Sequence, residues 1–309
     1  MVNKKTCRDI AWSIGLQKYI LNDIKTSHPH KIILVDYPGF NLRLAKQIHA
    51  LFDVEIIYYI SPQVWAWKET RIKKIKKYID KLIVIFPFEV SWFKQRGVDV
   101  EYFGHPLINP RNAPLIKKTN SSLFTVGLFP GSREQEIEQH LPLLEETIAL
   151  LRKTNSKMHF VVCLAPGINI KKMEPLQKLG GVEIIADTRA ALCCCSVAIV
   201  ASGTATLECA LSNTPFVVIY KTSLISWFLA KYLIAVDYVC IVNLLANKKV
   251  VEELLQKEAT PKNVVGAVLK LLDTMDVVKK DLSLVAESSC SAALFLSLST
   301  RLTVVKKFG

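Results

Sequence analysis

Short runs of β-branched and aliphatic residues alternate along the chain with longer segments in which apolar residues recur at helical spacing. This alternation is typical of a parallel sheet whose strands are joined by crossover helices. In the first third of the chain it predicts strands at residues 31–35, 54–60, 81–86 and 100–103. Helical segments are predicted between them, over residues 42–51, 68–78 and 89–96.

A second alternating series follows residues 109–122, a segment with two prolines and few large apolar side chains that we interpret as an interdomain linker. The series predicts strands at residues 123–129, 159–164, 182–185, 197–200 and 216–219, with helices over 134–152, near 171, over 204–211 and from 224 onward. We therefore expect two doubly wound α/β domains, residues 1–112 and 113–287. Residues 288–309 are expected to form a helix that returns to the first domain.

The composition supports a folded protein with an anionic partner. Half of the 309 residues are hydrophobic and 22% are charged, which excludes an intrinsically disordered chain and supplies two domain cores. Forty Lys and Arg against 27 Asp and Glu leave a net charge of +13. Such an excess predicts binding to nucleic acid, to an acidic membrane surface or to a phosphorylated small molecule, and composition leaves the three open.

Neither the cysteines nor the apolar runs indicate a secreted or membrane-spanning chain. Three of the eight cysteines are consecutive, Cys193 to Cys195, and none forms a C-x₂-C pair. This spacing predicts buried reduced thiols in a cytosolic protein, without disulfides or zinc. No apolar run reaches the roughly 20 residues of a membrane-spanning helix, and residues 1–25 lack the features of a signal peptide.

Two turns in the second domain carry residues suited to phosphate. Gly131, Ser132 and Arg133 follow one strand and open a helix, so backbone N–H groups and a guanidinium can face an anion. Taken alone, this turn is equally well an ordinary connection with a solvated arginine.

The second turn, Ser202-Gly203-Thr204, has the same position after a later strand, and Glu208 lies one helical turn beyond it. This spacing fits a nucleoside diphosphate whose ribose hydroxyls reach the carboxylate. The alternative is an ordinary helix cap with Glu208 on the surface. Because two such turns occur in one domain, this alternative is less favoured.

Asp36 ends the first strand and precedes the Pro38-Gly39 turn, where a carboxylate faces the crevice of an α/β fold. We interpret it as a candidate general base, with a turn-forming Asp as the commoner alternative. His105 also ends a strand, and a hydrogen-bonded structural role is favoured for it.

A basic segment follows a loop that contains Trp65 and Trp67. Seven Lys and Arg between residues 68 and 81 face only two acidic residues. Such a segment could stack on bases, lie at a membrane interface or be a solvated helix face. Residues 224–245 are also far more apolar than a surface helix needs, which is typical either of a core helix or of a patch that meets acyl chains.

Taken together, these motifs resemble the lipid-A-disaccharide synthase family of glycosyltransferases. The matching stretches, in family order, are residues 36–41, 61–68, 86–89, 104–106, 128–133, 201–209 and 237–245. The resemblance implies a GT-B fold and inverting transfer of a sugar from UDP-2,3-diacylglucosamine to 2,3-diacylglucosamine 1-phosphate, with release of UDP. It also implies a peripheral location on the cytoplasmic face of the bacterial inner membrane.

The resemblance also implies roles for single residues and partners. Asp36 would be the general base and Arg133 would bind the UDP phosphates, together with the Ser202 to Thr204 turn. Glu208 and Asn243 would bind the rest of the nucleotide. No cofactor or metal is expected, since helix termini and a cation can stabilise the leaving diphosphate. The expected partners are the two acylated sugars, an anionic membrane surface and a second copy in a homodimer, and no nucleic acid.

One family feature has no counterpart in this chain. The family begins with a strand and a Gly-rich loop of the type G-E-x-S-G-D, which no segment matches. The first domain is therefore expected to be incomplete, unless residues 1–29 or a separate chain substitute for that part. The alternatives are another GT-B enzyme that uses a UDP-sugar, transferase or epimerase, or a protein that binds the donor without turnover.

Overall fold

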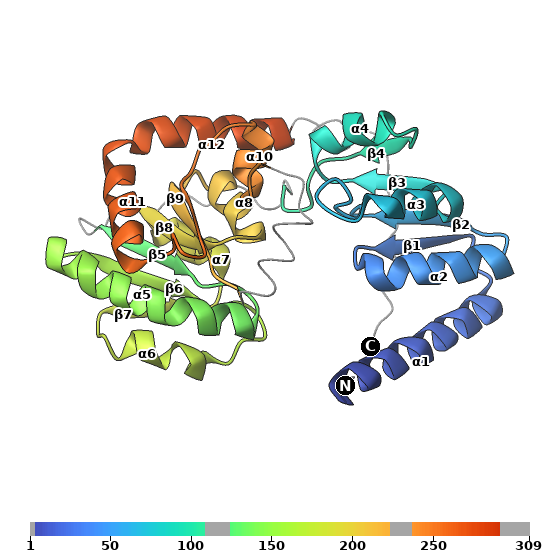
Figure 1. Cartoon of the computed structure of the whole chain (residues 1–309), viewed down its shortest axis with the longest axis horizontal. Helices are drawn as coiled ribbons and strands as arrows, with labels where there is room; N and C mark the ends of the chain where they lie inside the picture. The colour runs from blue at the N-terminus through green and yellow to red at the C-terminus, as the bar shows by residue number, and fades with distance from the viewer. Residues whose placement is uncertain (1–3, 109–123, 223–236, 291–309) are drawn as a thin grey trace. The chain divides into compact units, whose positions relative to one another are not determined.

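The computed structural model describes residues 4–108, 124–222 and 237–290. They divide into two compact units, the first ending at His105 and the second beginning at Pro106. Each unit has a parallel sheet and a hydrophobic core of its own (Figure 1). The expected α/β class is thereby confirmed. The predicted boundary after residue 112, the linker and most of segment 288–309 lie outside the described residues.

The first unit contains a four-stranded sheet in the order β1-β2-β3-β4. The predicted strands and helices are all present, and β1 has the predicted bounds. Residues 4–27 form a helix, so in the described chain they supply no strand in place of the family's first one. The elements are α1 (Lys4–Ser27), β1 (Lys31–Val35), α2 (Pro38–Leu51), β2 (Glu55–Tyr59), the 3₁₀ helix η1 (Glu69–Arg71), α3 (Ile72–Tyr78), β3 (Lys81–Val84), α4 (Pro87–Lys94) and β4 (Val100–Tyr102).

All crossovers of this sheet run in one direction, so within the described residues the crossover helices cover only one of its faces. Because βα crossovers are right-handed, successive strands added on the same side place their helices on the same face. That face holds Leu34, Tyr58 and Leu82 in the core with α2, α3 and α4. On the opposite face, Ile33 and Val35 of β1 are 50% and 52% exposed. Among the described residues, the unit is thus one half of a doubly wound arrangement.

The second unit contains a six-stranded parallel sheet in the order β10-β9-β8-β5-β6-β7. Its described elements are β5 (Thr125–Phe129), α5 (Glu134–Thr154), β6 (His159–Cys163), the 3₁₀ helix η3 (Ile170–Met173), α6 (Glu174–Gln177), β7 (Val182–Ile185), α7 (Thr188–Cys194), β8 (Val197–Ala201), α8 (Thr204–Leu211), β9 (Phe216–Tyr220), α10 (Ile241–Ala246), β10 (Glu253–Leu255), α11 (Pro261–Asp273) and α12 (Met275–Cys290).

This sheet is doubly wound, as predicted. The chain adds β6 and β7 on one side of β5, then returns to add β8, β9 and β10 on the other side. The crossover helices consequently cover both faces (Figure 1). Every residue of β5 and β8 is buried, which is the pattern of central strands. The direction of the chain switches between β5 and β8.

The structure tests two expectations, one about the cysteines and one about the apolar segment 224–245. Cys163, Cys195, Cys209 and Cys240 are buried reduced thiols, as predicted, but Cys194 is exposed, so the prediction is wrong there. The apolar segment 224–245 lies largely outside the described residues. Its described end forms α10, where Ile241 and Leu245 pack against the core of the second unit. For that part, the interpretation as a core helix holds.

Candidate functional site

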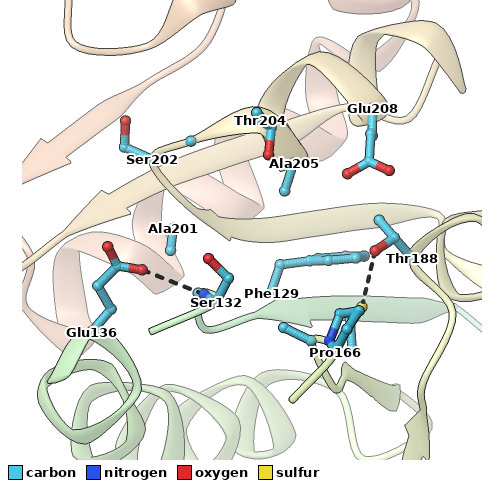
Figure 2. A pocket seen from close by; sticks show the side chains of 14 residues that line it. Phe129, Ser132, Glu136, Pro166, Thr188, Ala201, Ser202, Thr204, Ala205 and Glu208 are labelled. Carbon is cyan, nitrogen blue, oxygen red and sulfur yellow. Dashed lines mark hydrogen bonds between the residues drawn. The ribbon is translucent and has the colours of Figure 1, made fainter. Parts of the chain in front are cut away.

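A pocket of about 220 Å³ lies in the second unit at the carboxyl ends of β5 and β8. These are the two strands between which the sheet changes direction, the position where open α/β sheets bind ligands. Figure 2 shows side chains of both turns pointing into it. Six of the predicted binding residues line the pocket, namely Gly131, Ser132, Ser202, Gly203, Thr204 and Glu208.

The turn after β5 requires glycine. Gly131 has a φ of 119°, a conformation that other residues rarely adopt. A Cβ at this position would lie 2.9 Å from Oε2 of Glu136 and 3.7 Å from the Cβ of Ala201, so the turn has no room for a side chain. Gly131 therefore lets the backbone after β5 pass close to Glu136 and to Ala201 of β8, which also line the pocket.

Glu136 was not predicted, yet it lines the pocket beside Ser132 (Figure 2). Its Oε2 accepts a hydrogen bond of 3.4 Å from the backbone N–H of Ser132. Its Oε1 accepts from Nη1 of Arg133 at 2.5 Å. The side chain of Arg133 is 79% exposed and does not line the pocket. Only Nη1 is engaged by Glu136, so the guanidinium keeps further donors for an anion, and the predicted contact between Arg133 and a phosphate stays a prediction.

The turn after β8 presents the start of α8. Gly203 caps this helix without a side-chain hydrogen bond, so backbone N–H groups of the first turn remain available for an anion. Thr206 is buried, and its hydroxyl donates to the carbonyl of Gly203 at 2.7 Å. That bond fixes the turn from behind. The start of α5, at Arg133, likewise has no side-chain cap. Two helix N-termini therefore border one pocket.

Glu208 lies on α8 at the far side of the pocket, near Thr188 (Figure 2). Burial raises the pKa of its carboxyl, the nearby charge of Asp187 raises it further, and Arg189 lowers it. A carboxylate at this place can accept hydrogen bonds from ligand hydroxyls. Thr188 also pairs with the Cys163 thiol, at 3.6 Å between Sγ and Oγ1.

His140 hydrogen-bonds to the turn after β5, and the sequence did not predict this role. Its ring is fully buried. Nε2 accepts a 2.9 Å hydrogen bond from the backbone N–H of Lys221, so Nδ1 carries the proton and donates to the carbonyl of Pro130 at 2.7 Å. Burial lowers the pKa of this imidazole, which favours the neutral form that the two bonds require. His140 thereby ties the turn after β5 to the end of β9.

Asn243 is fully buried and does not line the pocket. Its amide nitrogen donates to Glu253 Oε1 and to the Val251 carbonyl, at 2.8 and 2.9 Å. Its amide oxygen accepts from the backbone N–H groups of Val250 and Val251. In the described structure the side chain is thus saturated by internal bonds, and its predicted contact with the nucleotide stays a prediction.

In the first unit, Asp36 follows β1 as expected, with an exposed side chain. Its backbone has a φ of 47°, and two side chains hold its carbonyl: Asn41 Nδ2 at 2.7 Å and the Tyr58 hydroxyl at 2.6 Å. The turn is therefore fixed by the sheet while the carboxylate remains open to solvent. Its role as a base stays a prediction.

The basic segment forms η1 and α3, with Lys73, Lys74, Lys76 and Lys77 exposed. Trp67 lies under Lys68, whose Nζ is 4.1 Å from the ring centroid. Within the residues that the structure describes, no cluster of His, Cys, Asp and Glu could hold a metal ion. None of the described helices is long and apolar enough to cross a membrane.

Comparison with known proteins now decides the family. The lipid-A-disaccharide synthetase family model matches residues 9–292. The chain belongs to the lipid-A-disaccharide synthase family. The enzyme named lipid-A-disaccharide synthase 1 from Legionella pneumophila strain Paris is 40% identical over 293 residues, which cover 86% of this chain and 76% of that protein.

A second relative of the same name, from Legionella pneumophila strain Philadelphia 1, is 44% identical over 247 residues. Those residues cover 77% of this chain and 64% of that protein. The chain thus spans between 64% and 76% of the length of these two synthases. The function expected from the sequence, formation of the lipid A disaccharide by glycosyl transfer, is that of the family to which the chain belongs.

Solved structures confirm the GT-B fold of this synthase family member. A putative UDP-N-acetylglucosamine 2-epimerase from Listeria monocytogenes superposes with a TM-score of 0.62 at 10% identity, covering 88% of this chain and 72% of that one. The spinosyn rhamnosyltransferase SpnG, solved with thymidine diphosphate, gives 0.60 at 12% identity, with 93% and 78% covered. At such low identity these structures establish the fold alone.

Proposed function

We propose that this chain binds UDP-2,3-diacylglucosamine in the pocket of the second unit and transfers the sugar to 2,3-diacylglucosamine 1-phosphate. The supporting observation is the convergence of two helix N-termini and Glu208 at the switch between β5 and β8. Helix N-termini favour anions, and the carboxylate suits ribose hydroxyls. The pocket is smaller than the roughly 300–1,000 Å³ of most small-molecule sites, so it suits the nucleotide part of the donor.

The transfer is proposed to be a direct displacement. The Asp36 carboxylate removes the proton from the acceptor hydroxyl, and that oxygen attacks the anomeric carbon on the face opposite to UDP. The bond from the anomeric carbon to the phosphate oxygen breaks, and its electron pair stays on UDP. The starts of α5 and α8, together with Arg133, stabilise the charge that develops on the diphosphate. The anomeric centre is inverted.

We also propose that the reaction needs no metal ion, because backbone N–H groups and a guanidinium supply the charge stabilisation. Activity that is unchanged after treatment with EDTA would agree with this proposal. Loss of activity that is restored by Mg²⁺ would contradict it.

The membrane relationship is a further part of the proposal. The exposed lysines of α3 and the exposed ring of Trp67 suit a peripheral location on an anionic bilayer, at the cytoplasmic face of the inner membrane, where the acylated substrates reside. A homodimer is proposed as the working form. Sedimentation with anionic vesicles and analytical ultracentrifugation test these two points separately.

The deciding experiment incubates the protein with both substrates and measures disaccharide by mass spectrometry and UDP by a coupled assay. We expect both products to form in equal amounts. Asp36→Ala is expected to abolish turnover and leave UDP affinity intact, whereas Asp53→Ala, which removes another exposed carboxylate of the same unit, changes neither. UDP binding without any disaccharide would reduce the function to donor binding, and loss of UDP affinity in Asp36→Ala would remove that residue from the role of base.

A further inference from the structure

Glu89 is a buried carboxylate that the proposed chemistry does not use. It is only 1% exposed, yet it accepts four hydrogen bonds. Oε2 accepts from the backbone N–H groups of Ile85 and Phe86, at 3.0 and 2.9 Å. These two bonds cap the start of α4, which is a common task for Glu at the third position of a helix.

The other carboxylate oxygen reaches a different part of the chain. Oε1 accepts from the Ser61 hydroxyl at 2.8 Å and from the Trp65 indole N–H at 2.9 Å, both in the loop that follows β2. Helix capping does not require these bonds. Burial raises the pKa of Glu89, whereas the four donors favour its ionised form. A fully paired buried carboxylate therefore ties the loop after β2 to the start of α4.

The loop and the helix together form an aromatic wall, which we define as Trp65, Phe86 and Phe88. The rings of Trp65 and Phe88 meet edge to face with centroids 5.0 Å apart, and those of Phe86 and Phe88 stack at 5.8 Å. Phe86 is buried, while Trp65 and Phe88 are half-buried. Because Glu89 accepts from its N–H, the side chain of Trp65 has no free polar atom.

The aromatic wall lies at the edge of the sheet that carries Asp36. Asp36 follows β1, Trp65 follows β2 and Phe86 follows β3, and these three strands are parallel neighbours. Their carboxyl ends consequently meet at one edge. A surface of rings without free polar atoms suits hydrocarbon, whereas sugar hydroxyls need hydrogen-bonding partners.

We propose that the aromatic wall binds an acyl chain of the acceptor and that Glu89 is the positioning residue that holds Trp65 in place for it. This inference rests on the proposed function, because it takes the acceptor to be an acylated sugar phosphate. It adds the class of group recognised and the residues that recognise it. Phe88 and Trp65 contact the chain, and Glu89 acts through Trp65 alone.

The test measures equilibrium binding of two radiolabelled probes, 2,3-diacylglucosamine 1-phosphate and glucosamine 1-phosphate without acyl chains, to the full chain in neutral detergent micelles. Phe88→Ala is expected to weaken binding of the acylated probe about tenfold, since it removes apolar contact area. Glu89→Gln keeps an oxygen for the α4 cap but turns an amide toward Trp65, and Trp65→Phe removes the tethered N–H. Each is expected to weaken the acylated probe about fivefold.

Binding of the unacylated probe should change by less than about twofold in all three variants, because it makes no contact with the rings. Gln95→Ala, a change of an exposed uncharged residue at the end of α4, is the matched control and should leave both probes unaffected. UDP affinity and the melting temperature, measured for every variant, show whether the fold is intact.

Equal weakening of both probes would assign the aromatic wall to the sugar ring and overturn the proposal. So would unchanged binding of the acylated probe in variants that fold, or its failure to bind the unmodified chain at all. The proposed function fails in a different way, when the acylated probe binds selectively but no disaccharide forms. If disaccharide forms and the three variants bind the acylated probe as tightly as the unmodified chain does, only the further inference fails.

Discussion

The two units are built from the same βα repeat, but they are wound differently, and the pocket described above lies in the second unit. In the second unit the chain reverses its direction of winding between β5 and β8, and the turns after these two strands border the pocket. In the first unit the described strands follow one another in a single direction. The pocket of the second unit thus lies where the winding reverses, which is where an open α/β sheet forms its crevice.

The direction of winding also decides how much of each sheet is buried. Helices on both faces leave β5 and β8 buried at every position. With helices on one face, β1 alternates between buried and exposed residues although its sequence, Lys-Ile-Ile-Leu-Val, is as apolar as that of a central strand. This contrast can be tested by substitutions in both units, beginning with His140, which joins two strand ends of the second unit.

Replacing the buried imidazole that joins two strand ends should have the largest effect. His140→Ala removes both hydrogen bonds and leaves a cavity, so we expect the second unit to lose about 3–4 kcal/mol of unfolding free energy. UDP affinity should fall as well, because the turn after β5 loses its anchor at Pro130. Urea unfolding and UDP titration measure the two effects. Gln139→Ala, at the exposed neighbouring position, is the control. Normal UDP affinity in a destabilised His140→Ala protein would separate the anchor from the site.

Acid should weaken both units, since each contains a buried histidine. Burial lowers the pKa of His105 to about 4 and also lowers that of His140. A histidine with a lowered pKa binds fewer protons when folded than when unfolded. Its contribution is therefore complete above the unfolded pKa of about 6.5 and is lost as the pH falls toward the folded value.

Between pH 7 and pH 5, His105 alone should cost about 2 kcal/mol of unfolding free energy. Urea unfolding at the two pH values measures this loss in a Trp227→Phe background, where the fluorescence comes from Trp12, Trp65, Trp67 and Trp92 of the first unit. In His140→Ala the first-unit signal should keep its pH dependence. Stability that rises on acidification would contradict the neutral, buried state of these rings.

The next effect concerns the turn that needs glycine. Gly131→Ala places a Cβ 2.9 Å from the Glu136 carboxylate at a φ of 119°, so we expect about 1–3 kcal/mol of destabilisation and weaker UDP binding. Gly266→Ala on α11 is the matched control, because its Cβ meets nothing within 4 Å and a helix favours alanine. Calorimetry and UDP titration should show a loss for the first variant and no loss for the second. Equal behaviour of the two would show that the turn tolerates a side chain.

Much of the fold could be predicted because its signals are local. The strand at 182–185 and the helix at 204–211 have the predicted bounds, since turn residues flank clear apolar runs. The helix over Lys4–Ser27 was not predicted, and β10, only three residues long, carries too little pattern to detect. The direction of winding in the first unit depends on which strands pair, which no short segment of sequence specifies.

The candidate site was predictable where ligand chemistry and turn chemistry coincide, as at Gly131 and Ser202. Glu136 had a usable signal, a carboxylate at the third position of a helix, which commonly reaches back to the helix start. Glu89 had the same signal for its cap of α4 but none for its bond to Trp65, which is 24 residues away, and His140 had none, because its partner Lys221 is 81 residues away. Asn243 shows the reverse case: a motif residue whose amide is consumed inside the fold.

The smallest effects come from a matched pair of strand substitutions that tests the burial contrast directly. Val126 of β5 is 0% exposed and Val35 of β1 is 52% exposed. Replacing a buried Val by Thr inserts an unpaired hydroxyl, so Val126→Thr should cost about 1–2 kcal/mol of unfolding free energy. Val35→Thr should change it by less than about 0.5 kcal/mol, since its hydroxyl meets solvent.

Urea unfolding measures the free energy of unfolding of both variants. Because both carry the same Val→Thr change, a difference between their costs reports the difference in burial of the two side chains. A cost at Val35 equal to that at Val126 would mean that the open face of the first sheet is covered in solution. The one-sided winding of the first unit would then no longer imply an exposed face, and the contrast between the units would lie in the pocket alone.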